Sequence, residues 1–211
     1  NSSVKYQEIA ASKISGGELY FRDLQADIHH MNKDSVLFNG PEPLQLKASA
    51  YLQGKSRISM HWSVPENGPP DHQQVHGQIS NLELSNVNTI LQTAAGITVE
   101  DGTLHDMHFQ FTARPDTATG KVQMQYSGLK IALHKEEGYR RFKKRKMLSW
   151  FANCLIRRNN PSPLGRDITG RVAFRRDPRK SVFAYWWQSI FSGIKPIVFR
   201  KPVRKLMDRR R

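Results

Sequence analysis

Histidines and carboxylates are the residues of this sequence that could do chemistry, but their spacing builds neither a catalytic nor a metal site. His72 and His76 share one face of an expected strand, yet no third ligand follows from the spacing, and zinc needs three or four. Asp101 and Asp106 lie near an expected turn without a recognisable partner. The sequence also has no phosphate-binding glycine loop and no nucleophile elbow. We therefore expect a protein that is not an enzyme and that uses no metal and no cofactor.

The single cysteine, Cys154, indicates little chemistry. It falls on the apolar side of a helix expected over residues 138–157, where a buried and inert thiol is the usual outcome. Because it has no second cysteine, it can form no disulfide within the chain and cannot complete a thiolate metal site.

Charge divides the chain into two parts. Residues 1–130 hold 10 Lys and Arg against 13 Asp and Glu, whereas residues 131–211 hold 23 against 5. So strong a basic excess predicts that the C-terminal part contacts something anionic, either a membrane surface or the phosphates of a nucleic acid. The residues expected to form this contact surface are Lys143, Lys144, Arg145, Lys146, Trp186, Trp187, Arg204, Lys205, Arg209, Arg210 and Arg211.

Trp186 and Trp187 admit more than one interpretation. An indole beside Lys and Arg suits a membrane interface, but the two rings could equally pack their helix onto a sheet and leave the cations in water. Nucleic-acid binding is the weaker alternative, because both rings fall on the apolar stripe of an expected helix over 179–191, whereas base-stacking residues stand on an exposed basic face.

The elements that must position these residues begin with antiparallel strands in residues 1–134. In residues 44–52 apolar side chains alternate with polar ones, and the alternation restarts in residues 57–64 after a turn. Further alternating segments, at 107–111 and 122–126, extend this pattern to a meander.

Three slips in the alternation predict that this sheet is curved. The apolar parity changes between Phe21 and Leu24, between Ile79 and Leu82, and between Tyr126 and Leu129. Each pair flanks a two-residue segment of the sequence. A slip by one residue indicates a β-bulge, and bulges bend and twist a strand. We expect a curved, twisted antiparallel sheet.

Residues 135–211 are expected to form a basic helical region that packs on the sheet and adds one further strand. Helical spacing of apolar residues predicts amphipathic helices over 138–157 and about 179–191. The Gly-Ile-Lys-Pro segment 193–196 is expected to end the second helix. Between the helices, residues 169–175 alternate like a strand.

The apolar face of the expected sheet lacks a sufficient cover. The only helix expected within residues 1–134, Val87–Ala95, is too short to cover it. Either the sheet folds over into a sandwich or barrel, or it forms an open groove whose floor receives acyl chains. The candidate floor residues are Leu44, Leu46, Ile58, Met60, Trp62, Phe109, Phe111, Val122 and Met124.

Short stretches spread over most of the chain carry a family resemblance. They are Ile14–Phe21, His76–Ile79, Asn88–Leu91, Ile97–Leu104, Gly120–Ile131 and Asn159–Pro161. In this order they resemble the C-terminal region of AsmA-like proteins of the Gram-negative envelope, a family that includes bridge-like lipid-transfer proteins. The resemblance favours the open groove over the sandwich, because it supplies a ligand for the uncovered floor.

The resemblance also implies a function. It implies a periplasmic module, tethered to the inner membrane through an N-terminal segment that this sequence lacks, that holds phospholipid or other acyl chains for phospholipid transport or outer-membrane homeostasis. Its basic, aromatic end would dock on an anionic membrane or an envelope protein. We therefore expect a mainly β (α+β) fold with an open groove, a short internal helix and two C-terminal amphipathic helices. A nucleic-acid-binding protein and a purely structural β scaffold are the alternatives.

Overall fold

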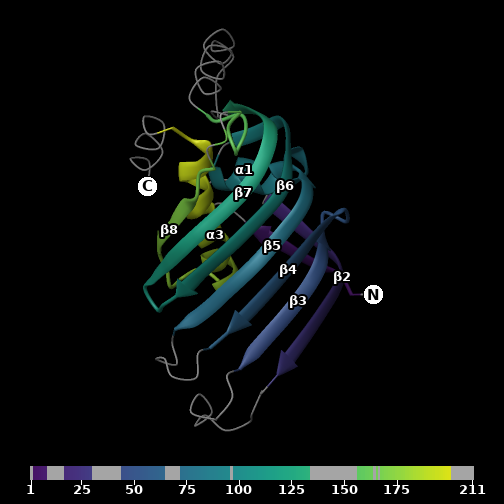
Figure 1. Cartoon of the computed structure of the whole chain (residues 1–211). Coiled ribbons are helices and arrows are strands. Elements are labelled where there is room, and N and C mark those ends of the chain that lie inside the picture. The colour runs from purple at the N-terminus through teal and green to yellow at the C-terminus, as the bar shows by residue number, and fades with distance from the viewer. Residues whose placement is uncertain are drawn as a thin grey trace.

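One antiparallel sheet of eight strands organises the chain (Figure 1). Each strand is hydrogen-bonded to the next in sequence order, so β1 and β8 form the two edges and the sheet is open. The computed structural model describes residues 2–8, 17–29, 44–64, 72–95, 97–133, 156–163, 165 and 167–200. The expected mainly β fold with a curved, open antiparallel sheet is confirmed.

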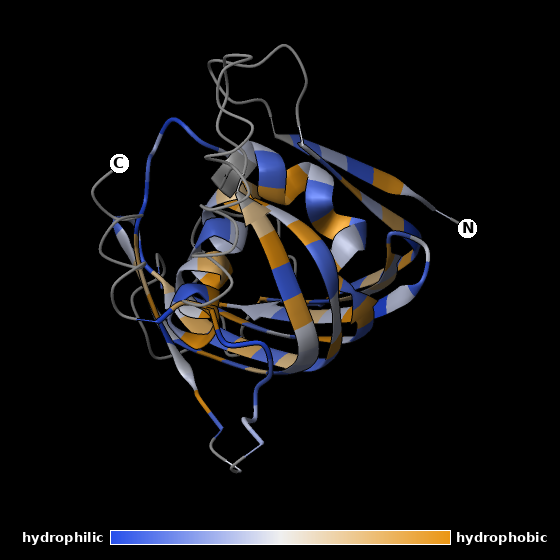
Figure 2. Cartoon of the chain, turned by 90° about the horizontal axis from the view of Figure 1, so that it is seen from above, coloured by the Kyte–Doolittle hydropathy of each residue, from blue (hydrophilic) through white to orange (hydrophobic). Residues whose placement is uncertain are grey.

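The strands and helices have the following bounds. The strands are β1 (Val4–Glu8), β2 (Gly17–His29), β3 (Gln45–Leu52), β4 (Ser56–Ser63), β5 (Gln73–Glu83), β6 (Ile97–Ala113), β7 (Thr117–Leu133) and β8 (Gly170–Arg175). The helices are the 3-10 helix η2 (Leu84–Val87), α1 (Asn88–Ala95) and α3 (Val182–Val198). Figure 2, seen from above, shows α1 and α3 inside the curve of the sheet. Among the described residues no helix is long and apolar enough to cross a membrane.

The register of the strands sorts side chains onto two faces. One cross-strand row on the concave face, where the helices lie, is Ile28, Leu46, Trp62, Val75, Phe111, Gly120 and Val172. The adjacent row points to the outer face and consists of Asp27, Lys47, His61, His76, Gln110, Lys121 and Arg171. Because successive residues of a strand point to opposite faces, the concave face is apolar and the outer face is polar.

The predicted irregularities are present and have local causes. In β2 the register shifts between Arg22 and Gln25, and in β7 an extra residue stands beside Gly128, whose φ of +69° suits glycine. In β5 the slip coincides with Asn81 at φ +53°. The pairing of β5 with β6 stays in register here, because β6 has an irregularity of its own beside His105, directly opposite Asn81.

Glycines on both sides let α3 lie close to β7 and β8. A Cβ atom on Gly170 would lie 1.8 Å from the carbonyl oxygen of Gly193, and one on Gly193 would lie 2.6 Å from Cγ2 of Val122. Real Cβ contacts are never this short, so neither position has room for a side chain. Gly193 is therefore a contact residue inside the helix, and the prediction that it ends the helix is wrong.

The ends of α3 are fixed by side chains that the helix pattern does not reveal. At its start, the Oγ of Ser181 accepts a hydrogen bond from the backbone N–H of Ala184 at 3.1 Å, a normal N-cap. At its end, Nη1 of Arg157 donates to the carbonyl oxygens of Pro196 and Ile197 at 3.0 and 2.9 Å. These bonds satisfy carbonyls that a helix end leaves free, so α3 continues past the predicted end near 191.

The short internal helix is found close to where it is predicted. α1 begins at Asn88, whose side chain exchanges two hydrogen bonds of 2.8 and 2.7 Å with the backbone of Val99 in β6. The Oγ1 of Thr89 donates to the carbonyl of Glu18 at 2.7 Å, which ties α1 to β2. The other helix expected in the C-terminal part, over 138–157, lies outside the described residues, as does Cys154.

Candidate functional site

A cavity of about 560 Å³ lies between the concave face of the sheet and the helices. Strands β1 to β7 form its floor and walls, η2 and α1 contribute at one end, and α3 contributes along one side. Among the described residues that line it, Lys5 and Ser49 are the only ones with a polar, non-aromatic side chain, and the strand register directs the side chain of Ser49 to the outer face. We call this cavity the trough. Its volume is in the range of ligand pockets, roughly 300–1,000 Å³.

The trough exists because small side chains stand where no helix packs closely on the sheet. α3 packs chiefly against β8 and β7, and on that side the concave face is filled by buried residues such as Phe111 and Val122. On β3 the same face carries Ala48 and Ala50, which both line the trough. A methyl group fills little of the space between the sheet and the helix, so an apolar hollow is left above β3.

The apolar stripe of α3 forms one wall of the trough. Trp186, Trp187, Ile190 and Ile194 line it and are half-buried. The rings of Trp186 and Trp62 lie 6.5 Å apart between centroids, so the helix reaches across to β4. The helix is held in this position at Tyr185, whose hydroxyl donates to the carbonyl of Arg114 at 3.0 Å; burial raises the pKa of Tyr185 to about 12, which keeps this donor protonated.

The first turn of α3 meets the opposite edge of the sheet through aromatic rings. The centroid of Phe183 lies 4.4 Å from that of Tyr6 in β1 and 6.0 Å from that of Phe21 in β2. These contacts bring together the two ends of an otherwise open sheet. We call this contact the aromatic seam; it closes one side of the trough without a β-ladder.

The predicted floor residues do not all line the trough. Those that line it are Ile58, Met60, Phe109 and Met124. Phe111 and Val122 are buried, with Val122 pressed under Gly193 of α3. The remaining three are half-buried and do not line the trough: Leu44, Leu46 and Trp62. The periodicity finds the right face, but the position of α3 decides which residues stay open to a ligand.

The predicted contact surface is largely outside the described residues. This applies to Lys143, Lys144, Arg145, Lys146, Arg204, Lys205, Arg209, Arg210 and Arg211. Trp186 and Trp187 are described, and they line the trough rather than a surface that faces away from the sheet. The structure therefore favours the interpretation that both rings pack the helix onto the sheet.

Several lining residues were not predicted from the sequence. They include Tyr6 of β1, Ile90 of α1, and Ile190 and Ile194 of α3. The stripe on α3 carried a signal, since its apolar residues recur at helical spacing. Tyr6 carried none, because its place in the aromatic seam depends on a residue 177 positions later in the chain.

Side chains that could do chemistry lie on the outer face, away from the trough. No group of three His, Cys, Asp or Glu side chains in the described part of the chain could hold a metal ion. Nε2 of His105 and Oγ of Ser127 are 2.8 Å apart, but this exposed pair lines neither the trough nor the hollow on the outer face. A nucleophile needs a substrate pocket beside it, and this pair has none in the described structure.

Comparisons with known proteins return no relative. No protein-family model matches the chain, and no curated protein or solved structure is significantly similar to it. The geometry and chemistry of the trough therefore provide the basis for a functional interpretation.

Proposed function

We propose that this chain is a noncatalytic module that binds lipid acyl chains in the trough. The observation that carries the proposal is the nearly unbroken apolar lining of a cavity of about 560 Å³. Water in such a cavity finds too few hydrogen-bond partners to be held there, so an apolar cavity stays dry or takes an apolar ligand. Each CH₂ group moved from water into it contributes about 0.8 kcal/mol.

The shape of the trough suits a linear chain. Along β6, lining residues run from Ile97 to Phe109, and at about 3.3 Å per residue this corresponds to at most about 40 Å of strand. An extended hydrocarbon can follow such a path and stay in contact with its walls. A compact ring system would fill only a part of it.

The lining predicts weak discrimination between headgroups. Lys5 is the only charged residue among the described lining residues, and its ammonium lies 2.7 Å from a carboxylate oxygen of Glu18. The hydrogen bond to Glu18 raises the pKa of Lys5, so its charge already has a partner. A headgroup would stay in water at an open end of the trough, and the acyl chain would supply the affinity.

The resemblance to AsmA-like proteins supports a cellular setting for this proposal. In that setting the chain is the distal part of a larger periplasmic protein of the Gram-negative envelope that takes part in phospholipid transport or outer-membrane homeostasis. The basic C-terminal part would dock on an anionic membrane or on an envelope protein. The rival idea of nucleic-acid binding is weakened, because Trp186 and Trp187 line the trough and are not free to stack on bases.

The experiment that tests the proposal measures acyl-chain binding directly. Palmitate is titrated against a fluorescent fatty acid bound to the purified chain, and an organic extract of the chain is analysed for phospholipid by mass spectrometry. We expect saturable displacement and stoichiometric lipid. If neither is found, the chain is a structural scaffold and the proposal is wrong.

A matched pair of variants places the binding in the trough. Ala48→Phe puts a ring into the space above β3 and is expected to weaken palmitate binding by tenfold or more. Ala173→Phe makes the same change at an exposed position of β8 and should leave binding unchanged. Equal affinity of both variants would show that palmitate binds elsewhere. Urea unfolding of both variants checks that they are folded.

A further inference from the structure

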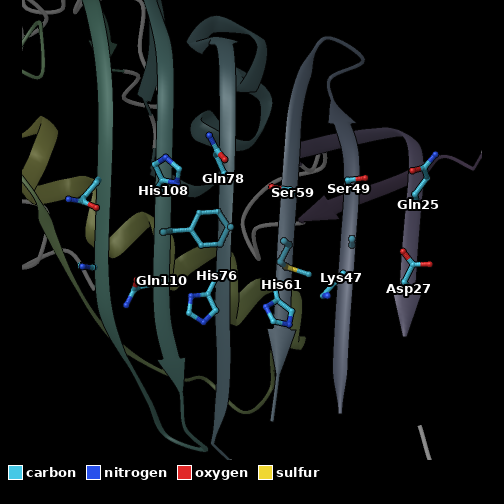
Figure 3. Close-up of a pocket in the computed structure, with 16 residues that line it drawn as sticks. Gln25, Asp27, Lys47, Ser49, Ser59, His61, His76, Gln78, His108 and Gln110 are labelled. Carbon is cyan, nitrogen blue, oxygen red and sulfur yellow. The ribbon is translucent and has the colours of Figure 1, made fainter. Parts of the chain in front are cut away.

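The outer face of the sheet carries a second hollow, of about 520 Å³. It shares Ala48, Ser49, Met60 and Phe109 with the lining of the trough, and its other lining residues do not line the trough. Figure 3 shows its labelled side chains on the face of the sheet opposite α3. Twelve polar side chains line it: glutamines, serines, histidines, two lysines and one aspartate. They come from six successive strands, β2 to β7. We call this set the outer hollow.

The outer hollow is an ordered array of two cross-strand rows. The first row is Asp27, Lys47, His61, His76, Gln110 and Lys121. The second row is Gln25, Ser49, Ser59, Gln78, His108 and Gln123. Neighbouring strands are about 4.8 Å apart, so each row extends over roughly 24 Å. The array is long and narrow, as a site for a polymer would be.

Part of the array is held in place by hydrogen bonds. Oδ2 of Asp106 lies 2.6 Å from Nε2 of His108, while its Oδ1 accepts from Nε2 of Gln78 at 2.8 Å and from the Oγ of Ser80 at 3.3 Å. The rings of His61 and His76 are stacked with their centroids 6.1 Å apart. Groups fixed in this way lose less conformational entropy when a ligand binds.

The array is rich in donors, and its lining holds one more cation than carboxylates. Lys47 and Lys121 bring two cations into the outer hollow and Asp27 brings one carboxylate. The carboxylate of Asp106, beside the lining, is already bonded to Gln78 and Ser80 and lies against His108. Burial lowers the pKa of His61, and the neighbouring Lys47 lowers it further, so the positive field of Lys47 reaches the middle of the array. That field attracts an anionic group.

We propose that the outer hollow binds an acidic glycan, a chain of hydroxylated sugars that bear carboxylate or phosphate groups. Lys47, Lys121 and the ring N–H groups of His61 and His76 meet the acidic groups, while the glutamine amides and serine hydroxyls suit the sugar hydroxyls. The outer hollow has no Trp or Tyr among its lining residues, and the one Phe that lines it, Phe109, is only 4% exposed, so a nucleic acid would find no large exposed ring to stack on. It also lacks the exposed aromatic anchors that a protein partner would use.

The test places the ligand by following signals from inside the outer hollow. Trigalacturonate, which carries three carboxylates, is titrated against the chain while the ring proton signals of His61 and His76 are recorded by NMR at pH 7. We expect saturable shifts of both signals. Neutral maltotriose, titrated in the same way, should bind with an affinity at least tenfold lower. Unchanged ring signals would overturn the proposal.

Charge-matched variants separate a defined site from the general attraction of a chain with net charge +15. Lys47→Gln with Lys121→Gln should weaken trigalacturonate binding by tenfold or more. Lys55→Gln with Arg158→Gln removes the same charge from exposed positions outside the outer hollow and should change it less than twofold. Equal losses would show non-specific attraction and would overturn the proposal.

Two further probes decide the class of ligand. Inorganic phosphate and single-stranded oligothymidylate are titrated under the same conditions. If either binds the outer hollow more tightly than trigalacturonate, the site belongs to a simple anion or to a nucleic acid, and the glycan proposal is wrong. Palmitate binding is measured in parallel and should be the same for both double charge variants, because the trough lies on the other face of the sheet.

Discussion

The two faces of the sheet are made by the same strands but differ in depth, cover and chemistry. The concave face is apolar and is partly covered by α1 and α3, whereas the outer face is polar and carries a shallow hollow. Ile58 and Ser59 show how close the two surfaces are, since these neighbours in β4 line the trough and the outer hollow respectively. Alternation thus places two candidate sites on one backbone, and adjacent residues report on different sites.

The largest expected effect concerns the contact that holds the helix against the concave face. Gly170→Val would place a side chain where a Cβ atom would already lie 1.8 Å from the carbonyl oxygen of Gly193. We expect a loss of about 3 kcal/mol or more in the free energy of unfolding, measured with urea. Ala173→Val, at an exposed position of the same strand, should cost less than about 0.5 kcal/mol. A tolerated Gly170→Val would contradict the close packing of α3.

The second prediction uses the two neighbours in β4 to separate the sites. Ile58→Asp places a carboxylate in the apolar lining, where it has no partner, and should lower palmitate affinity by tenfold or more. Ser59→Asp should leave palmitate affinity within twofold and should weaken trigalacturonate binding severalfold, because it adds a negative charge to the outer hollow. Both affinities are measured on both variants. The two-face account fails if either variant impairs both ligands equally.

The third prediction concerns the aromatic seam. Phe183→Ala removes the ring that contacts Tyr6 and Phe21, so the trough opens on that side. We expect palmitate to dissociate severalfold faster, as followed by stopped-flow fluorescence, with a stability loss of about 1–2 kcal/mol for a half-buried ring. Val182→Ala, at a side chain that is 42% exposed, is the control. An unchanged dissociation rate would show that the seam does not limit release.

The smallest effect is a pH dependence that arises on the outer face. Burial, Lys47 and His76 lower the pKa of His61. His61 therefore binds a proton more weakly in the folded chain than in the unfolded chain, where a histidine titrates near pH 6.5. The contribution of His61 to stability is therefore fully present above the ordinary histidine pKa and is lost as the pH falls below it. His61→Gln should reduce the loss of stability between pH 7 and pH 5. An identical pH profile in both proteins would contradict the lowered pKa.

Local signals made much of the sheet predictable from the sequence. Alternation gave the correct face for Ile58, Met60 and Met124, because the period of a strand is set by its backbone. The parity slips located the irregularities beside Asn81 and Gly128, where the backbone is left-handed. These features depend on neighbours in the sequence, and a sequence pattern can record them.

The extent of α3 and the exact lining of the trough were not predictable, because both depend on distant partners. Gly193 and Pro196 look like helix breakers, but Arg157 binds the last carbonyls and Gly170 makes room for the helix. For the same reason Val122 is sealed under α3 while Met124 lines the trough. The outer hollow was missed because its polar residues look like an ordinary solvated face until the register places them in rows.

The most direct test of the central claim is a crystal structure of the chain with palmitate that carries a bromine on its terminal carbon. Anomalous scattering from bromine marks the end of the acyl chain without ambiguity. The account predicts a bromine peak in the trough, between α3 and the alanines of β3. Bromine found only outside the trough, or a trough filled by the protein's own side chains, would contradict it.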